Sequence, residues 1–419
     1  MKKILAVILS VLMMTSALAG CDGKEASSAL KVGAGSGEII FPDAMFPMSE
    51  GFTTTHDNAN ARVMLFENGE KAAIVSMELV NCPTDCIEAI KDIVNEKTGT
   101  PKENVWVHST HIFSTPHAPD DAENKALFNE AVITAATAAV EQAVETLQQA
   151  KIGVATGESA VTANRNIMTG EGYVHGLNGD GATDHTMTIL KAESLDGKTI
   201  GLLFAYGTRS YCTDVSRGTT DREITTDFTG YATTMLEEEF GAPALFCMTA
   251  AGDQHPIMAA LDVEVHEDGT YTQIDLGVQE GLKIAEELGT IFGNDAITIA
   301  KTITCDDSAA KVACTSGSYE WATTEGDGEM EITVEAMCIG DTASIGIKPE
   351  VNCNTSLELK AASPFKNTLL MSFVNGDQNY MPDAQAYEIN TVEVSKSNLA
   401  KGAAEQLVTA SVELLTGLK

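Results

Sequence analysis

Basic side chains are scarce in this sequence. Only 26 lysines and arginines stand against 60 aspartates and glutamates, which gives a formal net charge of −34. A surface of that charge repels nucleic acid and anionic lipid head groups. We therefore expect no nucleic-acid partner, and we interpret the acidic surface mainly as a solubilising one.

Long apolar runs are absent after residue 21, so no later segment predicts a membrane-spanning helix. Residues 1–21, MKKILAVILSVLMMTSALAGC, have two lysines, a short apolar run and small residues before Cys21. This resembles a bacterial lipoprotein signal, in which Cys21 becomes the lipidated N-terminus; an ordinary secretory signal is the alternative. Both place the protein outside the cytoplasm. We expect a signal peptide at 1–20, a polar tether at 21–40 and one folded domain at 41–419.

No two cysteines form a CxxC pair, so a zinc site made of thiolates is not predicted. Eight cysteines follow Cys21, and outside the cytosol an even number permits disulfides without indicating their pairing. Cys247, inside the apolar run ALFCMTA, is expected to be a buried thiol.

Short apolar runs alternate with amphipathic segments through the first part of the chain. The predicted strands are 71–80, 104–110, 200–206 and 244–250, and the predicted helices are 83–97, 122–150, 228–240 and 271–292. From about residue 296 four strand-like runs follow, AITIAKTITC, KVACTSGSYEW, MEITVEAMCIG and TASIGIKPE, before a closing helix at 397–417. We predict an α/β fold with a mixed sheet, flanking helices and a β-rich second part.

Histidine is also rare, yet three of the eight histidines fall within VHSTHIFSTPH, directly after the strand at 104–110. Polar residues gather after other predicted strands as well, where α/β proteins usually keep their sites. These are AAGDQHP (250–256), GIKPE (346–350) and NGDQNYMP (375–382), together with TANRNI (162–167) in a turn-rich stretch.

Together these stretches resemble motifs of the neutral, non-lysosomal ceramidase family, which are zinc-dependent amidohydrolases. The similar segments, in order, are THIFSTPH (110–117), Asn164-Arg165, IGLLFAYGTRS (200–210) with DFTGYA (227–232), GDQHP (252–256), KPE (348–350) and YMP (380–382). The resemblance runs from about residue 50 to the C-terminus. It implies the catalytic-domain fold of that family and hydrolysis of an amide bond in an N-acyl, lipid-like substrate.

The resemblance also implies a Zn²⁺ site, with His111, Glu350 and Tyr380 matching three of the family's four ligands. The family's second histidine has no counterpart, since the chain reads Phe204-Ala205-Tyr206-Gly207-Thr208 there. We expect His117 to replace it, because a loop containing Pro116 can fold back and bring residues six apart onto one ion. The family's later tyrosine is missing as well, near Asn390-Thr391-Val392-Glu393, and its additional C-terminal domain does not fit in the available length.

Four residues are assigned catalytic roles on this basis: Arg165, His255, Tyr380 and Asp253. A zinc-bound hydroxide would attack the carbonyl carbon. Arg165 and Tyr380 would then stabilise the oxyanion, and His255 or His117 would protonate the leaving amine. Asp253 has an alternative role as a turn former, because Gly-Asp is a common turn pair.

Other histidines have simpler interpretations. His108 shares a strand face with Trp106 and is expected to be packed or hydrogen-bonded. His56, with Asp57, is a weaker candidate for the pocket. His175, His185 and His266 are expected on the surface.

Two further readings of the function stay open. One is a catalytically inactive, ligand-binding surface lipoprotein on the same fold, in which the loss of ligands has abolished the metal site. The other is a solute-binding lipoprotein that serves a transporter. The β-rich second part argues against the latter, because such binders usually consist of two similar α/β lobes.

Overall fold

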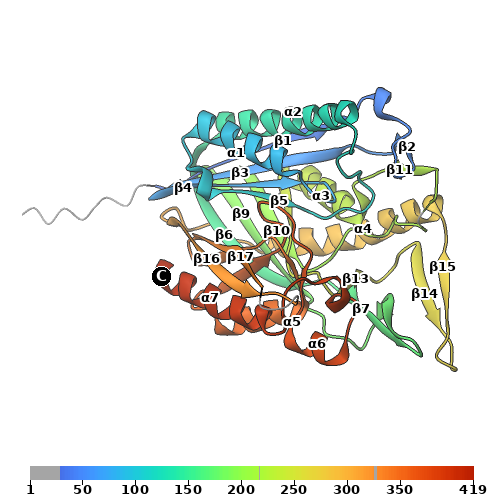
Figure 1. Cartoon of the computed structure of the whole chain (residues 1–419). Helices are drawn as coiled ribbons and strands as arrows, with labels where there is room; N and C mark the ends of the chain where they lie inside the picture. The colour runs from blue at the N-terminus through green and yellow to red at the C-terminus, as the bar shows by residue number, and fades with distance from the viewer. Residues whose placement is uncertain (1–28, 217, 325–327) are drawn as a thin grey trace, which may run out of the picture.

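The protein stacks four layers, with helices outside and two β-sheets between them (Figure 1). The computed structural model describes residues 29–216, 218–324 and 328–419. The larger sheet is mixed, and its eight strands follow the order β12 (Ala244–Met248), β10 (Thr199–Tyr206), β9 (Thr186–Ser194), β6 (Gln148–Glu158), β1 (Lys31–Ile39), β3 (Ala59–Asn68), β4 (Glu70–Met77) and β5 (Val105–Ser109). Within it the pairs β4–β5 and β10–β12 are parallel.

A smaller, four-stranded sheet packs against one face of the larger one. Its order is β16 (Val312–Ala322), β17 (Glu329–Ile339), β18 (Thr342–Gly346) and β20 (Asn367–Met371). Apolar side chains from both sheets, including Trp106, Met337 and Met371, form the core between them. The outer face of the smaller sheet is covered by α5 (Cys353–Ala362) and α7 (Ala403–Leu418) (Figure 1).

Four helices cover the other face of the larger sheet: α1 (Thr84–Thr98), α2 (Ala122–Thr146), α3 (Asp227–Phe240) and α4 (Val278–Lys301). Helix α2 lies unusually close to β1. A Cβ atom built at Gly35 would lie 2.1 Å from the carbonyl oxygen of Ala139, and Gly33 and Gly37 face the helix in the same way. The glycines of β1 and the alanines of α2 are therefore matched, because only small residues permit this contact.

The carboxyl ends of several strands meet at one edge of the molecule. Single bridges join His108 at the end of β5 to Val374 after β20, and Ile112 to Ser210 after β10. Short strand pairs complete this edge: β2 (Phe52–Thr55) with β11 (Arg222–Ile224), β7 (Thr162–Thr169) with β8 (Gly172–Asn178) and β13 (Gln254–Pro256), β14 (Leu261–Val265) with β15 (Tyr271–Asp275), and β19 (Glu350–Val351) with β21 (Tyr380–Met381). A short helix, α6 (Ala384–Ile389), follows β21.

The predicted α/β class with a mixed sheet, flanking helices and a β-rich second part is confirmed. The strands expected at 71–80, 104–110, 200–206 and 244–250 are β4, β5, β10 and β12, and the helices expected at 83–97 and 228–240 are α1 and α3.

Other boundaries were predicted wrongly. Residues 271–275 form β15, and α4 continues to Lys301 through residues expected to be a strand, because Phe292, Ala296 and Ile299 extend its buried face at helical spacing. Helix α2 ends at Thr146, before β6, and α7 begins only after Gly402, whose φ is 100°. TANRNI belongs to β7 rather than to turns.

The N-terminal division was partly wrong. Lys31–Ile39, placed in the predicted tether, is β1, paired with β3 along its whole length and with β6 at its start. Because glycines alternate with small residues in this segment, the sequence pattern did not indicate a strand, although the segment packs closely under α2. The predicted signal peptide and Cys21 lie outside the described residues. Among the residues described, no helix is long and apolar enough to span a bilayer.

All eight cysteines after Cys21 are free thiols, so none of the permitted disulfides is formed among them. Cys247 is fully buried, as predicted, and burial raises its pKa.

Candidate functional site

A buried guanidinium group occupies the centre of the predicted site. Arg209, two residues after the Gly207 that follows β10, donates from Nε to Glu350 Oε1 at 2.7 Å, and its Nη2 contacts Glu350 Oε2. Nη2 also approaches Tyr380 Oη at 2.7 Å and the carbonyl oxygen of Gly252 at 3.2 Å. Glu350 and Tyr380 are partners in the β19–β21 register, so Arg209 links two of the three residues that the resemblance assigned to zinc.

Gly207, directly after β10, lies in the segment where the second histidine is missing, and it leaves no space for a side chain. A Cβ atom built at Gly207 would lie 2.9 Å from the carbonyl oxygen of Ala250. Any side chain there would require the backbone after β12 to shift. The close approach of these two strand ends therefore requires a glycine at position 207 and excludes a histidine there.

A second buried ion pair lies beside the first. Arg165, on β7, donates to Glu393 Oε1 from Nε at 2.8 Å and from Nη2 at 2.7 Å, and Asn166 Nδ2 donates to Glu393 Oε2 at 2.9 Å. The guanidinium carbons of Arg165 and Arg209 lie 5.3 and 5.4 Å from the centre of the Tyr380 ring. Glu393 stands in the segment where the family's later tyrosine is missing.

His111 is held by protein groups. Its backbone has a positive φ of 57°, its Nδ1 lies 2.7 Å from the carbonyl oxygen of Val80, and its ring packs against Phe373 and Phe113 at centroid distances of 4.4 and 4.7 Å. Burial lowers its pKa, which the charge of nearby Glu350 opposes. The neutral imidazole is thus favoured by its surroundings.

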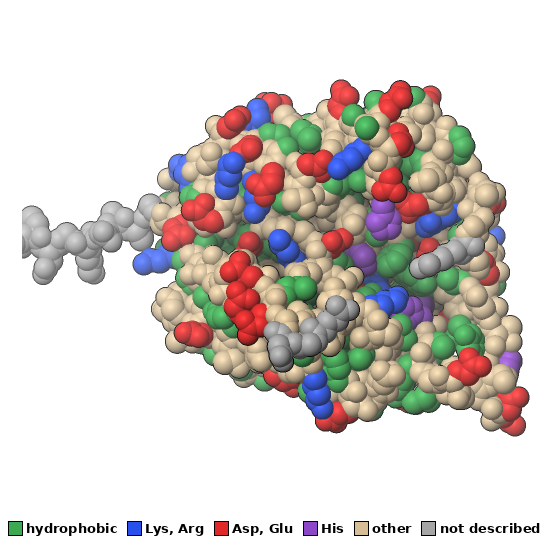
Figure 2. Space-filling view, viewed as in Figure 1, with side chains coloured by type: hydrophobic (Ala, Val, Ile, Leu, Met, Phe, Trp, Pro, Cys, Tyr) green, Lys and Arg blue, Asp and Glu red, His purple; other side chains and the backbone are tan. Residues whose placement is uncertain are grey.

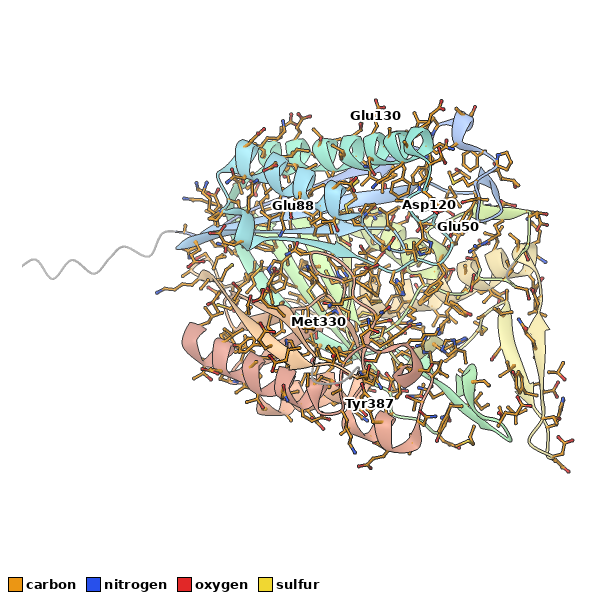
Figure 3. All side chains as sticks on the ribbon, viewed as in Figure 1. Glu50, Glu88, Asp120, Glu130, Met330 and Tyr387 are labelled. Carbon is orange, nitrogen blue, oxygen red and sulfur yellow. The ribbon has the colours of Figure 1, made fainter. Side chains whose placement is uncertain are left out.

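His117 does not converge on His111 as expected. Its side chain is 55% exposed, and its Nδ1 lies 2.9 Å from Oε2 of Glu50, a residue labelled in Figure 3. The other oxygen of Glu50, Oε1, accepts the His117 backbone N–H at 2.9 Å. The hydrogen bond to Glu50 raises the pKa of His117. The predicted local replacement of the lost histidine therefore does not take place.

These residues do not fit a zinc ion. Among the described residues, no group of three or more His, Cys, Asp or Glu side chains is placed to hold a metal. The guanidinium of Arg209 has donors only and stays charged, and it uses the oxygens of Glu350 and Tyr380 that a cation would need. The predicted set of His111, His117, Glu350 and Tyr380 is consequently not assembled.

A cavity of about 570 Å³ opens in front of the two arginines. Three of the four predicted catalytic residues, Arg165, His255 and Tyr380, line it together with Arg209, His175 and Lys396. Figure 2 shows histidine and basic side chains gathered in the hollow between the α1–α2 side and the α5–α6 side of the molecule. The structure therefore brings these three residues together, whereas their catalytic roles stay predictions.

His255 is buried, and Tyr380 is partly buried. His255 Nδ1 lies 2.6 Å from the carbonyl oxygen of Pro256, and its ring meets Tyr211 edge-on at 5.2 Å. Burial lowers the pKa of His255 and raises that of Tyr380, although the Arg165 charge works in the opposite direction on Tyr380. Both groups are therefore neutral hydrogen-bonding groups near pH 7.

Asp253 lies outside this cavity and lines a separate one of about 200 Å³. Its carboxylate accepts hydrogen bonds from Gln254 Nε2 at 2.9 Å, Cys353 N at 2.8 Å and Asn164 Nδ2 at 3.2 Å, and burial raises its pKa to about 7. Its contacts are those of a residue that holds loops together. The alternative reading of Asp253 as a turn residue fits this arrangement better than catalysis.

Several residues differ from their sequence interpretation. His175, expected on the surface, lines the main cavity because β8 pairs with β7, and its buried Nε2 has no hydrogen-bond partner among the described residues. His108 is packed and hydrogen-bonded as predicted, with Nδ1 2.9 Å from Ser372 O and Nε2 accepting from Met248 N at 2.9 Å. The sequence analysis did not identify Arg209 or Glu393 as site residues. Arg209 could have been recognised, because it is an arginine shortly after the buried strand β10.

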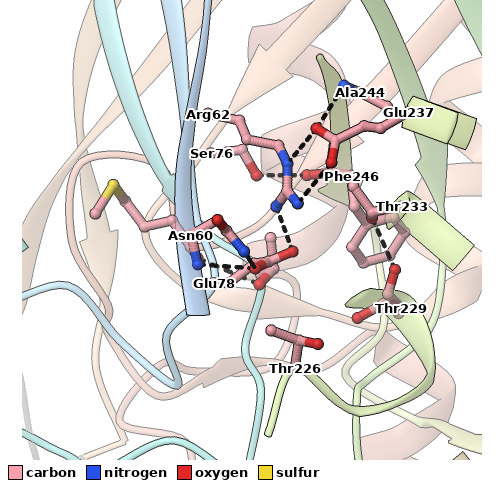
Figure 4. Close-up of polar contacts among 12 residues, drawn as sticks. Asn60, Arg62, Ser76, Glu78, Thr226, Thr229, Thr233, Glu237, Ala244 and Phe246 are labelled. Carbon is pink, nitrogen blue, oxygen red and sulfur yellow. Dashed lines mark hydrogen bonds and ion pairs between the residues drawn. The ribbon is translucent and has the colours of Figure 1, made fainter. Parts of the chain in front are cut away.

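His56 and Asp57 line neither of these cavities but a third one, of about 490 Å³, beside Arg62. There Arg62 bridges Glu78 and Glu237, as Figure 4 shows, and thereby joins β3, the end of β4 and α3. This cluster is a structural cross-link behind the site.

No family model and no curated protein matches the sequence. Solved structures of ceramidases match the fold. The neutral ceramidase from Pseudomonas aeruginosa superposes with a TM-score of 0.72 and 15% sequence identity over 93% of this chain and 74% of that one. A ceramidase complexed with C2 gives a TM-score of 0.71 and 15% identity over 93% of this chain and 75% of that one. The predicted resemblance is confirmed at the level of structure: the chain has the neutral ceramidase fold.

Proposed function

We propose that this protein binds a small N-acyl ligand in the Arg165–Arg209 cavity without zinc, on a fold that it shares with hydrolases. The observation that carries the proposal is the contact of Arg209 with both Glu350 and Tyr380. At that position the guanidinium supplies a fixed positive charge in place of a metal ion. It cannot lower the pKa of a water molecule as a bound zinc does.

The cavity suits recognition of a polar group next to an apolar one. Arg165 and Arg209 present hydrogen-bond donors, which bind carbonyl and carboxylate oxygens well. Phe113, Tyr211 and Leu261 supply apolar surface on the same walls. Such a combination is typical of small-molecule sites, in which a few polar groups orient the ligand inside an apolar enclosure.

The proposed location is the outer face of a cell membrane, where a lipid on Cys21 would anchor the chain. This part of the proposal rests on the N-terminal sequence alone. An inactive, lipid-anchored binding protein was one of the two alternatives open at the sequence level, and the arrangement around Arg209 favours it over zinc-dependent hydrolysis.

Amide hydrolysis is the second candidate. The observation in its favour is that Arg165, His255 and Tyr380 share one cavity, as expected of a hydrolytic site. The two candidates differ in a measurable way, because only the second one predicts turnover.

The test combines metal content with turnover. The purified chain and a Glu350→Gln variant are analysed for zinc by mass spectrometry before and after incubation with zinc, and are assayed with a fluorogenic N-acyl amide. Glu388→Gln is the matched control, because Glu388 carries the same carboxylate on an exposed side chain. We expect zinc well below one ion per chain and no turnover. About one zinc per chain, lost only in Glu350→Gln, together with turnover, would refute the proposal.

A further inference from the structure

We propose that the ligand of the Arg165–Arg209 cavity carries a carboxylate attached to an aromatic or branched apolar group, and that Lys396 and the free Nη1 of Arg209 bind the carboxylate. This inference rests on the proposed binding function and adds the chemical class of the ligand. It follows from the charges, the unused hydrogen-bond donors and the apolar wall of the cavity.

Positive charge prevails in the cavity although the chain as a whole is strongly acidic. Arg165, Arg209 and Lys396 line it, and among the described residues Asp214 is the only carboxylate that does so. Asp214 already pairs with Arg222 at 3.3 Å. Lys396 has no carboxylate within 4.0 Å in the described part of the chain, even though acidic side chains outnumber basic ones by 60 to 26. Other lysines of the described residues also lack an ion pair, but Lys396 lines the cavity beside Arg165 and Arg209, and this grouping of cations favours an anionic ligand.

Hydrogen-bond donors remain available where this anion would lie. Arg209 uses Nε and Nη2 for Glu350, Tyr380 and Gly252, and its Nη1 has no hydrogen-bond partner among the described residues. His175 Nε2 is buried and also lacks a partner. Buried polar atoms in folded proteins are nearly always paired, so an unpaired one in a cavity wall marks a position for a ligand atom or water.

The electrostatic surroundings of His175 agree with this assignment. Burial, and then the positive charges of Arg165 and Lys396, lower its pKa to about 2. The charges of Arg165 and Lys396 therefore contribute a positive field at His175, although burial is the larger cause of the shift. A carboxylate placed there would be stabilised by that field in a partly desolvated setting.

The apolar lining of the cavity indicates the rest of the ligand. Phe113, Tyr211, Val215 and Leu261 line the same cavity, and Phe113 and Tyr211 contact each other edge-on at 5.1 Å. A volume of about 570 Å³ exceeds what a small inorganic anion needs and lies within the usual range for organic ligands. An N-acyl amino acid with an apolar side chain has the required carboxylate, carbonyl and apolar group.

The experiment compares two probes of nearly the same shape, one anionic and one neutral. Binding of N-acetyl-L-phenylalanine and of its neutral amide, N-acetyl-L-phenylalaninamide, is measured by isothermal titration calorimetry on the full chain and on a Lys396→Gln variant. Lys401→Gln is the matched control, because Lys401 is also an exposed lysine near the C-terminus but pairs with Glu388. Lys396 is exposed and makes no side-chain hydrogen bond, so its replacement is expected to preserve folding.

We expect the acid to bind at least about tenfold more tightly than the amide, since a charge-assisted hydrogen bond contributes on that order. Lys396→Gln should remove most of this preference, whereas Lys401→Gln should leave it unchanged. Equal binding of acid and amide, equal effects of the two lysine variants, or no binding of either probe would overturn the carboxylate assignment. The zinc content and turnover measured above would be unaffected by that result, so failure of this inference is distinguishable from failure of the proposed function.

Discussion

Arg209 and Glu350 provide the sharpest test of the reasoning, because their pairing decides whether the site can hold a metal. Both side chains are buried, with 4% and 1% exposed. Replacing Arg209 by methionine would leave the Glu350 carboxylate buried without its counter-charge. Breaking a buried ion pair on one side typically costs about 3–5 kcal/mol. We expect Arg209→Met to lower the free energy of unfolding by that amount, and Glu350→Gln to do so by a similar amount.

The double variant Arg209→Met with Glu350→Gln should be far less destabilised than the sum of the two single variants. Removing both charges leaves neutral groups of similar volume, and such exchanges are often close to neutral. The expected double-mutant coupling is therefore at least about 2–3 kcal/mol. Urea unfolding is a suitable assay, because the fluorescence of Trp106 and Trp321 reports unfolding of both sheets, where these tryptophans are buried.

The Lys401–Glu388 pair is the control for this cycle. Its atoms are 2.9 Å apart, but its side chains are 49% and 67% exposed, so removing Lys401 should cost no more than about 0.5 kcal/mol. The reasoning fails if Arg209→Met is as harmless as Lys401→Gln, or if the effects at Arg209 and Glu350 are additive. Either result would mean that the guanidinium does not compensate the carboxylate in solution and that Glu350 is free to bind a metal.

Three further predictions concern pH and packing. Because Glu50 raises the pKa of His117, the pair stabilises the fold below the unfolded His117 pKa of 6.5, and this stabilisation is lost as the pH rises through the folded pKa. In urea unfolding, His117→Ala should therefore lower the free energy of unfolding by about 0.5 kcal/mol at pH 5.5 and not at all at pH 9. A cost that is the same at both pH values would contradict this prediction. Burial lowers the pKa of His108 to about 4, so between about pH 6.5 and pH 4 the histidine is protonated only in the unfolded state. In that range the free energy of unfolding of the wild type should fall with decreasing pH more steeply than that of His108→Gln, by up to about 1.4 kcal/mol per pH unit. Gly35→Ala places a Cβ 2.1 Å from a carbonyl oxygen of α2 and should lower the free energy of unfolding by more than about 2 kcal/mol, whereas Gly417→Ala, which meets no atom within 4 Å, should not lower it. Equal effects of the two glycine variants would refute the close packing of β1 on α2.

Much of the fold could be predicted because its strands and helices carry their own periodicity. The runs that became β4, β5, β10 and β12 are short, apolar and bounded by polar residues, so burial in a sheet was the simplest interpretation. The strand β1 could not be recognised in this way. Its sequence, KVGAGSGEI, has glycines at positions 33, 35 and 37 because α2 lies directly against them, and that contact exists only in the folded chain.

The candidate site, too, was predictable from the sequence only in part. The sequence by itself determined the order of the polar segments after the strands, the absence of a second histidine near Gly207 and the resemblance to the ceramidase fold. Only the tertiary structure decided how those segments are used: it turned His117 toward Glu50 and Arg209 toward Glu350 and Tyr380. The physical reason is that charge pairing in a buried site depends on which side chains from distant strand ends come within bonding distance, and sequence spacing does not contain that information.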